Sequence, residues 1–290
     1  MAKLPRSLHG RVVVVTGGGR GIGKAIATAL AAKGCRVAIG DLDAASARET
    51  AAGLGGEEHV GLALDVTDRP GFTTFLDEIE RRLGPVDILV NNAGIMAVGP
   101  FDEEDEATVV RQLEINLHAV IHGTKEAVRR MKPRGTGHIV NVASSAGKTG
   151  FPNLATYCAT KHGVVGMSEA VRSELRGTGV EITVVMPGIV RTELATGLVE
   201  TRGFKISTAE EVAELVVEAL EFPRFDVFVP KSIGPTWAAL QVVPRRAREA
   251  IARALKIDRA LLDADRDARA VYEARAAASA PGAERERETV

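Results

Sequence analysis

The chain has 290 residues, of which 45% are hydrophobic, and its formal net charge is −1 at pH 7. This length supports one large α/β domain, or one domain with an appendage. The balanced charge gives no overall electrostatic reason to expect nucleic-acid binding. The two cysteines, Cys35 and Cys158, lack C-x-x-C spacing, which argues against a disulfide framework or a structural zinc site. The first ten residues contain no apolar run typical of a signal peptide, and no apolar stretch approaches the roughly 18 residues of a membrane-spanning helix. We therefore expect a soluble, cytoplasmic protein.

Short runs rich in β-branched residues alternate with longer helical patterns. Continuous apolar strands predict burial on both faces, and the alternation predicts an α/β fold with a parallel, doubly wound sheet covered by helices on both faces. The seven predicted strands cover residues 11–16, 35–40, 59–64, 86–91, 137–143, 180–186 and 225–229. The predicted helices between them cover residues 22–33, 43–53, 69–83, 103–131, 155–177 and 208–221.

The pattern changes after residue 230. There the only tryptophan, Trp237, and two prolines precede a stretch rich in Ala, Arg and Asp. We expect one domain over residues 1–230, a helical C-terminal extension over residues 231–279, and a disordered tail over residues 280–290.

The stretch TGGGRGIG at residues 16–23 joins the first predicted strand to the first predicted helix. Glycines there let another group approach the backbone closely and accept unusual φ angles. A helix N-terminus also offers free N–H groups that suit a pyrophosphate. A tight turn with close helix–strand packing is the alternative explanation. We expect this loop to bind a dinucleotide through six residues: Gly17, Gly19, Arg20, Gly21, Ile22 and Gly23.

Asp41 lies where the second predicted strand ends. A carboxylate at that point accepts hydrogen bonds from an adenosine ribose diol and repels a 2′-phosphate. Capping of the next helix is the alternative role, but Asp43 fits that role better. Arg20 would favour a 2′-phosphate, whereas Asp41 followed by Leu42 rather than by a basic residue favours NAD over NADP. Two residues after the third predicted strand are expected to flank an adenine, with loop capping as the alternative for the first: Asp65 and Val66.

Tyr157 and Lys161 form a Y-x-x-x-K pair, which shares one face of the predicted helix over residues 155–177. A nearby ammonium group lowers the pKa of a tyrosine from its ordinary value of about 10. Such a tyrosine could exchange a proton with an alcohol or carbonyl oxygen. Ser144, at the end of the fifth predicted strand, could orient the same oxygen by a hydrogen bond. The pair alone is a weak signal, but it becomes specific together with the serine, the glycine loop and the acidic strand end.

Further motifs stand in the same order along the chain. N-N-A-G occupies residues 91–94, Asn116 lies within EINLHAV, and P-G-I-V-R-T occupies residues 187–192. With the glycine loop, the serine and the Y-x-x-x-K pair, they closely resemble the short-chain dehydrogenase/reductase family over roughly residues 8–230. Ser145 is the alternative match for the family serine. The resemblance implies a Rossmann-type domain that holds both the cofactor and the catalytic residues.

The resemblance also implies a role for each catalytic residue. Tyr157 would be the general acid/base, and Lys161 would lower its pKa and hold the nicotinamide ribose. Ser144 would steady the reacting oxygen, and Asn116 would hold a water in a proton relay through Lys161. The residues implied to border the cofactor are Asn91, Asn92, Ala93, Gly94, Pro187, Gly188, Ile189 and Thr192.

The substrate is expected to meet mainly apolar walls. The segment over residues 193–207 reads as a mobile lid with an apolar inner face, and an ordinary surface loop is the alternative. Its apolar residues are Leu194, Leu198, Val199 and Phe204. Such walls suggest a steroid-like, retinoid-like, terpenoid or fatty alcohol or ketone. The expected wall residues are Ile95, Met96, Ala146, Phe151, Leu154, Leu194 and Leu198.

The extension beyond residue 230 places apolar residues beside three arginines, Arg245, Arg246 and Arg248. Four interpretations remain open for it. A helix could cover the substrate mouth, grip a neighbouring subunit, attach to an anionic membrane surface, or pack on the domain as an extra solvated helix.

The histidines do not indicate a metal site. His118 and His122 stand four residues apart on a predicted helix, but a third ligand is missing. We therefore expect no metal.

The main hypothesis is an NAD-dependent dehydrogenase of a hydrophobic secondary alcohol. An NADP-dependent carbonyl or 3-oxoacyl reductase is the second hypothesis, and a non-catalytic dinucleotide-binding regulator is the third. The resemblance implies a homodimer or homotetramer, built through the helices over residues 103–131 and 155–177, with no nucleic-acid partner.

Overall fold

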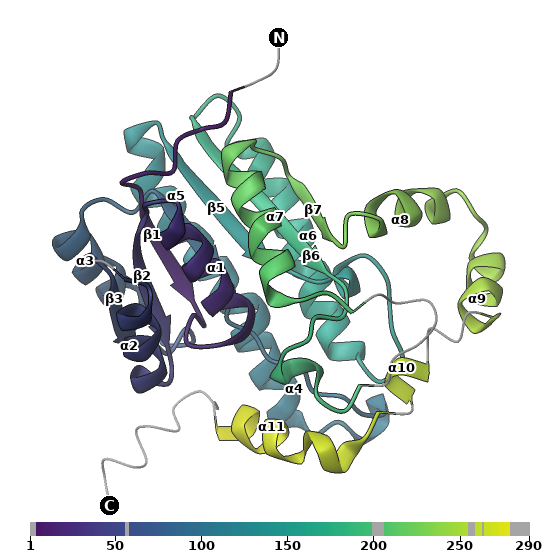
Figure 1. Ribbon diagram of the computed structural model, residues 1–290. Coiled ribbons are helices and arrows are strands. Elements are labelled where there is room, and N and C mark those ends of the chain that lie inside the picture. The colour runs from purple at the N-terminus through teal and green to yellow at the C-terminus, as the bar shows by residue number, and fades with distance from the viewer. Residues whose placement is uncertain (1–3, 56–57, 199–205, 255–258, 263, 279–290) are drawn as a thin grey trace, which may run out of the picture.

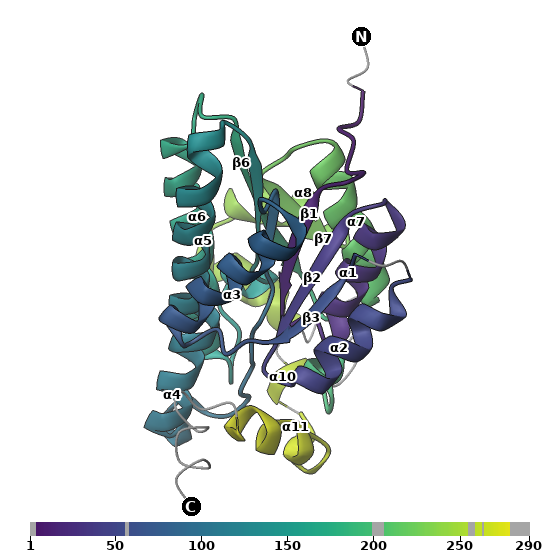
Figure 2. The same cartoon turned by 90° about the vertical axis from the view of Figure 1, so that its left-hand side faces the viewer.

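The computed structural model describes residues 4–55, 58–198, 206–254, 259–262 and 264–278. Over these residues the chain forms a central sheet between two layers of helices (Figure 1), which Figure 2 shows with the sheet close to edge-on. The sheet has seven strands in the order β3-β2-β1-β4-β5-β6-β7, and each neighbouring pair is parallel. The predicted doubly wound sheet is therefore confirmed.

The strands are short and almost entirely buried. Val12 and Val14 belong to one buried cluster and Val13 and Val15 to the other, because successive side chains of a strand point to opposite faces. This explains why the strands read as continuous apolar runs. The bounds are β1 Val12–Thr16, β2 Arg36–Asp41, β3 Val60–Ala63, β4 Ile88–Asn91, β5 Gly137–Val142, β6 Val180–Pro187 and β7 Asp226–Val229.

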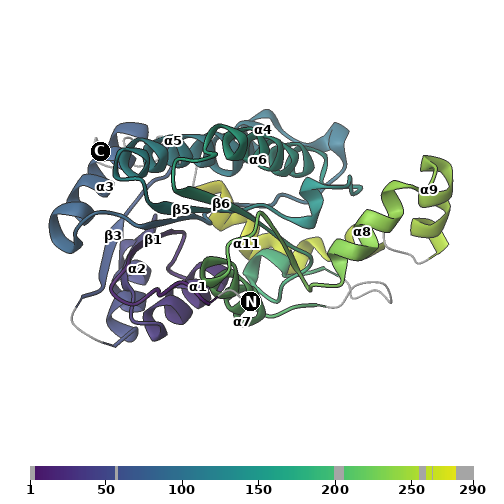
Figure 3. The ribbon, with the colours of Figure 1, turned by 90° about the horizontal axis from the view of Figure 1, so that it is seen from above.

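Helices cover both faces of the sheet. On one face lie α1 (Gly21–Ala32), α2 (Ala44–Gly53) and α7 (Ala209–Glu221). On the other lie α3 (Arg69–Leu83), α4 (Glu106–Leu113), α5 (Ala119–Met131) and α6 (Ala155–Glu174). Figure 3 shows the two layers from above.

The long helix expected over residues 103–131 begins three residues later, at Glu106, and contains a π-turn. It consists of α4 and α5 with a π-helix between them over Glu114–His118, which contains Asn116. A π-turn adds one residue within a turn but does not end the helix, so no helix stop or start signal marks it in the sequence. Such turns occur frequently at functional sites.

The predicted helical extension is present. It contains α8 (Ile233–Gln241), α9 (Arg245–Ala254), α10 (Arg259–Leu262) and α11 (Arg266–Ala278). In Figures 1 and 3, α8 and α9 lead away from the sheet beyond β7, whereas α11 returns beneath the carboxyl ends of the strands. The predicted disordered tail, residues 280–290, lies outside the described residues. Within the described part of the chain, no helix combines the length and the apolar character needed to cross a membrane. The proposed division into domains at residue 230 stays a prediction.

Candidate active site

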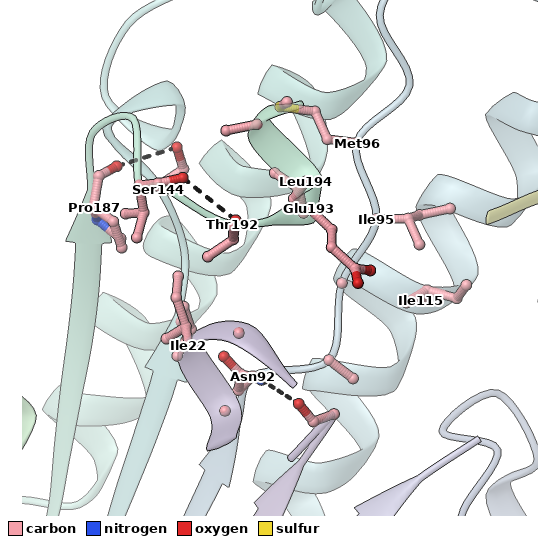
Figure 4. A pocket seen from close by; sticks show the side chains of 18 of the residues that line it. Ile22, Asn92, Ile95, Met96, Ile115, Ser144, Pro187, Thr192, Glu193 and Leu194 are labelled. Atoms are coloured by element: carbon pink, nitrogen blue, oxygen red, sulfur yellow. Dashed lines mark hydrogen bonds between the residues drawn. The ribbon is translucent and has the colours of Figure 1, made fainter. Parts of the chain in front are cut away.

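A cavity of about 610 Å³ lies at the carboxyl ends of the strands. It extends across the point between β1 and β4 where the strand order reverses, which is the usual ligand site of such sheets. Figure 4 shows side chains around it from the first turn of α1, from the residues that follow β4 and β5, and from the end of β6 and the segment after it. Every residue expected to border the cofactor or the substrate lines this cavity, with the exception of Gly19 and Asn91. The two remaining lid residues, Val199 and Phe204, lie outside the described residues.

The glycines of the loop serve packing at two positions and access at a third. A Cβ on Gly23 would lie 2.2 Å from the carbonyl oxygen of Gly17, and a Cβ on Gly17 would lie 2.9 Å from Cα of Ala93. These two positions fit the tight-turn explanation. Gly21 has a φ of +51° and lines the cavity, and a Cβ added there would lie 3.5 Å from Thr192. The loop therefore lets a ligand approach the backbone at Gly21.

The start of α1 suits an anion. Arg20 is its N-cap residue, and within the described chain no side chain caps this helix there. The first N–H groups of a helix have no partner inside the helix, and they carry partial positive charge. Together with the glycine loop, this donor set fits the pyrophosphate of a dinucleotide.

Asp41 braces the glycine loop from the end of β2. Its Oδ2 accepts a hydrogen bond from the Gly19 N–H at 2.9 Å, and its Oδ1 accepts one from the Asp43 N–H at 3.1 Å. A carboxylate has about four acceptor positions, so Asp41 can still accept from a ribose diol. Asp43 caps α2 by accepting from the N–H groups of Ala45 and Ser46, as the sequence indicated. Capping therefore does not explain Asp41.

Asp65 does have the alternative role that the sequence left open. Its Oδ1 accepts hydrogen bonds from the backbone N–H of Thr67 at 2.8 Å and from the Thr67 hydroxyl at 2.7 Å. Asp65 and Val66 nevertheless line the cavity. A loop cap and a wall beside an adenine are compatible here.

Three predicted site residues do not line the cavity. Gly19 acts through its bond to Asp41, as described above. The side chain of Asn91 donates to Asn141 at 2.9 Å, on the opposite face of the strand from the cavity residue Asn92. Asn116 is fully buried, and its side chain exchanges two hydrogen bonds of 2.8 Å with the backbone N–H and carbonyl of Ile95. Asn116 therefore holds a wall of the cavity in place, and its water-binding role stays a prediction.

Ser144, Tyr157 and Lys161 converge in the cavity, where each is at most 9% exposed. Tyr157 and Lys161 come from the first turns of α6, and the Lys161 Nζ lies 5.6 Å from the centre of the Tyr157 ring. Nζ donates to the carbonyl of Val142 at 3.0 Å. The Ser144 hydroxyl donates to the Pro187 carbonyl at 3.4 Å, and it forms a hydrogen bond with Tyr157.

Burial is the largest cause of the pKa shifts of Tyr157 and Lys161. It raises the pKa of Tyr157 above its ordinary value, while the hydrogen bond with Ser144 lowers that pKa and the neighbouring Tyr272 raises it. Burial also lowers the pKa of Lys161 to about 8. The sequence led us to expect a lowered pKa for Tyr157. In the protein without a cofactor, the pKa of Tyr157 is raised instead. The reason is that a water-poor cavity penalises the phenolate and the ammonium alike.

A family model described as short chain dehydrogenase matches residues 11–203. This chain belongs to the short-chain dehydrogenase family. A crystal structure of a short-chain dehydrogenase/reductase from Burkholderia phymatum in complex with NAD aligns with a TM-score of 0.74 and 28% identity, over 80% of this chain and 93% of that one. The family fold is thus confirmed.

Relatives of this short-chain dehydrogenase carry several names. A 3-oxoacyl-[acyl-carrier-protein] reductase of Haemophilus influenzae is 36% identical, over 67% of this chain and 79% of the relative. A D-threitol dehydrogenase of Mycolicibacterium smegmatis is 40% identical, over 64% of this chain and 73% of the relative. A trans-4-hydroxycyclohexanecarboxylate dehydrogenase of Sinomonas cyclohexanicum is 33% identical, over 75% of this chain and 88% of the relative. All three names describe oxidoreductases of alcohols or ketones, but they share no single substrate.

The structure adds cavity residues that the sequence analysis did not name, although a helix of the extension covering the substrate mouth was one of its four interpretations. Four come from the C-terminal extension of this dehydrogenase: Leu261, Tyr272, Arg275 and Ala276. The chain contains only two tyrosines, and both line the cavity. A tyrosine and an arginine three residues apart in an otherwise alanine-rich helix were the only signal for this part of the site.

The two histidines considered as metal ligands have separate partners. His118 bonds to Glu114 at 2.8 Å, and His122 packs edge-on against Phe72 and bonds to the carbonyl of Arg69. Among the described residues, no group of three or more His, Cys, Asp or Glu side chains is placed to hold a metal ion.

Proposed function

We propose that this short-chain dehydrogenase transfers a hydride between NAD(H) and a hydrophobic secondary alcohol or its ketone. One observation carries the proposal. A single cavity joins a dinucleotide-type glycine loop and Asp41 to the Ser144, Tyr157 and Lys161 group, and continues between apolar walls. The order of these three parts matches the adenosine, nicotinamide and substrate ends of a reacting complex.

The dinucleotide would be held by the loop around Gly21, by Asp41 at its ribose, and by Lys161 and Thr192 near its nicotinamide end. When bound, it accepts or supplies the hydride at nicotinamide C4. The protein supplies geometry and the proton.

The proton of the substrate alcohol would pass to or from Tyr157 Oη, with Ser144 holding the same oxygen by a hydrogen bond. Lys161 would favour the phenolate during this step, because an ammonium group stabilises a nearby negative charge. Its charge acts at short range in a buried site, where screening by water is weak. Only the protonated form of Lys161 can stabilise the phenolate in this way, so activity should depend on the protonation state of Lys161.

The substrate class follows from the walls. Around Tyr157 lie Met96, Ala146, Leu154 and Leu261, which form one buried apolar cluster, with Phe151, Leu194 and Leu198 packed against it. Burial of apolar surface is worth roughly 25 cal/mol per Å², so this end favours an apolar molecule. The steroid-like, retinoid-like, terpenoid and fatty classes all remain candidates.

The preference for NAD rests on charge. Asp41 and Asp43 both line the cavity where a 2′-phosphate would lie, and both are acidic. Arg20 is the nearby cation, but it pairs with Asp43 at 3.4 Å and with Glu193 at 3.5 Å. A 2′-phosphate would therefore face two carboxylates and an arginine already engaged with acidic partners.

The decisive experiment measures initial rates with NAD and NADP against a panel of hydrophobic secondary alcohols and the matching ketones. We expect turnover with NAD, and a loss of about 10²–10⁴-fold in kcat for Tyr157→Phe. NADH binding, followed by its fluorescence, should remain in that variant. NADH binding without turnover on the whole panel would favour the non-catalytic regulator.

A second variant tests the preference for NAD over NADP. Asp41→Asn keeps the shape of the side chain and removes its charge, so it should raise kcat/KM with NADP relative to NAD by about tenfold or more. A wild-type protein that prefers NADP would support the alternative of a carbonyl or 3-oxoacyl reductase. The name of the Haemophilus influenzae relative makes that alternative specific enough to test. The homodimeric or homotetrameric state and the cytoplasmic location stay predictions.

A further inference from the structure

We propose that the C-terminal segment from Leu261 to Ala276 forms a roof over the substrate end of the cavity, in which Tyr272 binds a polar group of the substrate and Arg269 positions the roof. The identity of the substrate rests on the function proposed above, but the roof itself does not. The name "roof" is used below for the described residues of this segment, 261–262 and 264–276.

Arg269 is the main anchor of the roof. It is only 1% exposed, although it lies on a helix at the edge of the molecule. Its guanidinium donates to the carbonyls of Leu194 at 3.2 Å, Thr196 at 2.9 Å and Met96 at 2.8 Å. Its Nε donates to Glu273 at 3.1 Å. Burial of a guanidinium is costly unless its donors are satisfied, so this set of bonds indicates a specific, built contact.

The bonds of Arg269 join parts of the site that are distant in sequence. Leu194 and Thr196 belong to the predicted lid after β6, and Met96 follows β4. Met96 and Arg269 are 173 residues apart in the chain. Arg269 therefore ties the roof to both walls of the substrate end.

Two backbone features outside Arg269 are shaped to receive the roof. Gly197 has a φ of +76°, and a Cβ there would lie 2.6 Å from the carbonyl oxygen of Asp265 and 2.8 Å from Cγ of Arg269. The Asp265 N–H donates to the Gly197 carbonyl at 2.9 Å. Asn153, the only non-glycine residue with a positive φ among those described, donates from its side chain to the Leu261 carbonyl at 3.2 Å. The lid segment and the loop before α6 thus fit the roof at separate points.

Tyr272 brings a hydroxyl into the substrate end. Its Oη accepts a hydrogen bond from the backbone N–H of Met96 at 2.8 Å, and its ring lies against the guanidinium of Arg269 at 5.1 Å. Because Oη accepts this bond, its own hydrogen remains a donor for an acceptor group of the substrate. Burial raises the pKa of Tyr272 to about 12, so the donor stays protonated at neutral pH.

The chemistry of the walls then defines the substrate more narrowly. Tyr157 acts on the reacting oxygen, and Tyr272 offers a second hydrogen bond beside apolar side chains that include Leu261 and Leu154. The fitting substrate is a hydrophobic alcohol or ketone with a second oxygen acceptor at some distance from the reacting carbon. A plain hydrocarbon alcohol would leave the Tyr272 donor without a partner.

The first experiment tests the roof without turnover. Hydrogen exchange would be followed in the full-length protein, in Arg269→Met and in Arg246→Met, which alters an exposed arginine of α9 as the matched control. We expect exchange in peptides over residues 94–98 and 192–198 to rise about tenfold or more in Arg269→Met only. NADH affinity should stay within about twofold, since these bonds lie at the substrate end. Equal exchange in the two variants would overturn the roof.

A conservative variant separates positioning from loss of folding. Arg269→Lys keeps the charge but lacks the planar fork, so it should restore only part of the protection at residues 94–98 and 192–198. Loss of protection across the whole sheet in Arg269→Met would mean unfolding. In that case the proposal is decided by Arg269→Lys, in the same peptides. We expect these peptides to be less protected in Arg269→Lys than in wild type. Equal protection in Arg269→Lys and wild type would overturn the proposal.

The second experiment tests Tyr272 as a specificity residue. Tyr272→Phe would be compared with wild type on pairs of hydrophobic secondary alcohols that differ only in a second oxygen. We expect KM to rise about tenfold for the oxygen-bearing member and to change little for the other, with kcat nearly unchanged. An equal effect on both members would overturn the assignment of Tyr272. If wild type turns over no member of the panel, the proposed function fails, and the exchange experiment still decides the roof.

Discussion

The two ends of the cavity are built in different ways. The cofactor end consists largely of backbone from consecutive motifs, such as the loop of residues 16–23 and residues 92–94. The substrate end consists of side chains from four separate segments, and its roof comes from the last part of the described chain. The structure of the cofactor end can therefore be predicted from local sequence motifs, whereas the structure of the substrate end depends on contacts across the whole fold.

This difference has a physical origin. A dinucleotide presents the same phosphates and riboses to every enzyme that binds it, so a helix N-terminus and close-packed glycines suffice. Substrates differ in shape from one enzyme to another, so the cavity walls around a substrate depend on the individual side chains of each enzyme. The two ends should therefore respond differently to the same kind of substitution.

Of the substitutions that compare the two ends, Gly23→Ala should have the larger effect, and it should act on the cofactor end. The new Cβ would lie 2.2 Å from the Gly17 carbonyl oxygen and 2.6 Å from Asn92 Nδ2, so the loop must move. We expect the Kd for NADH to rise at least about 100-fold, which is roughly 2.7 kcal/mol of binding free energy. Gly53→Ala, in α2, meets nothing within 4 Å and serves as the control. NADH binding by Gly23→Ala within a factor of two of wild type would contradict a rigid, backbone-built cofactor end.

Gly197→Ala makes the equivalent change at the substrate end. It introduces a side chain at a φ of +76° and crowds the Asp265 carbonyl oxygen at 2.6 Å. We expect KM for the alcohol to rise about tenfold, because the roof shifts, while the Kd for NADH changes less than about twofold. Gly150→Ala, also near the substrate end, has open space and is the matched control. If NADH binding weakens as much as substrate binding, the two ends are not separable.

Much of the fold could be predicted from the sequence. The strands are β-branched runs buried on both faces, so each one is visible locally, and helices such as α2 begin at a capping aspartate, Asp43. Short right-handed connections then limit the possible strand orders to a few. Ser144, Tyr157 and Lys161 could also be brought to one cavity, because they stand on elements whose ends meet at the same edge of the sheet.

The parts that could not be predicted have particular causes. Asn91 and Asn92 are adjacent, and only the strand's alternation decides which one faces the cavity. The π-turn at Asn116 lies inside a helix that does not end there, so no capping or stop signal marks it in the sequence. Arg269 reads as a solvated charge on an alanine-rich helix, and its burial follows only from carbonyls far away in the sequence. Long-range contacts of this kind leave no local pattern.

Lys161 lies where the two ends of the cavity meet, and its titration should have a modest effect on the stability of the protein. Burial lowers the pKa of Lys161 to about 8 in the folded protein, from 10.5 in a free lysine. Between these two values the unfolded chain binds more protons than the folded one, so folding becomes more favourable as the pH rises. Below about pH 8 the folded protein keeps a buried charge, and its stability is reduced.

The free energy of unfolding of the protein without cofactor should therefore rise between pH 7.5 and 9.5, by about 1–2 kcal/mol from this residue. Lys161→Met cannot titrate, so its stability relative to wild type should be greatest near pH 7 and should decline by the same amount toward pH 9.5. Urea unfolding at fixed ionic strength measures both curves, and the difference between them cancels the titration of Tyr157 and Tyr272 to first order. A constant difference over this pH range would show that Lys161 keeps its ordinary pKa. In that case the lysine would already be cationic throughout the working range, and the pH dependence of turnover would have to come from Tyr157.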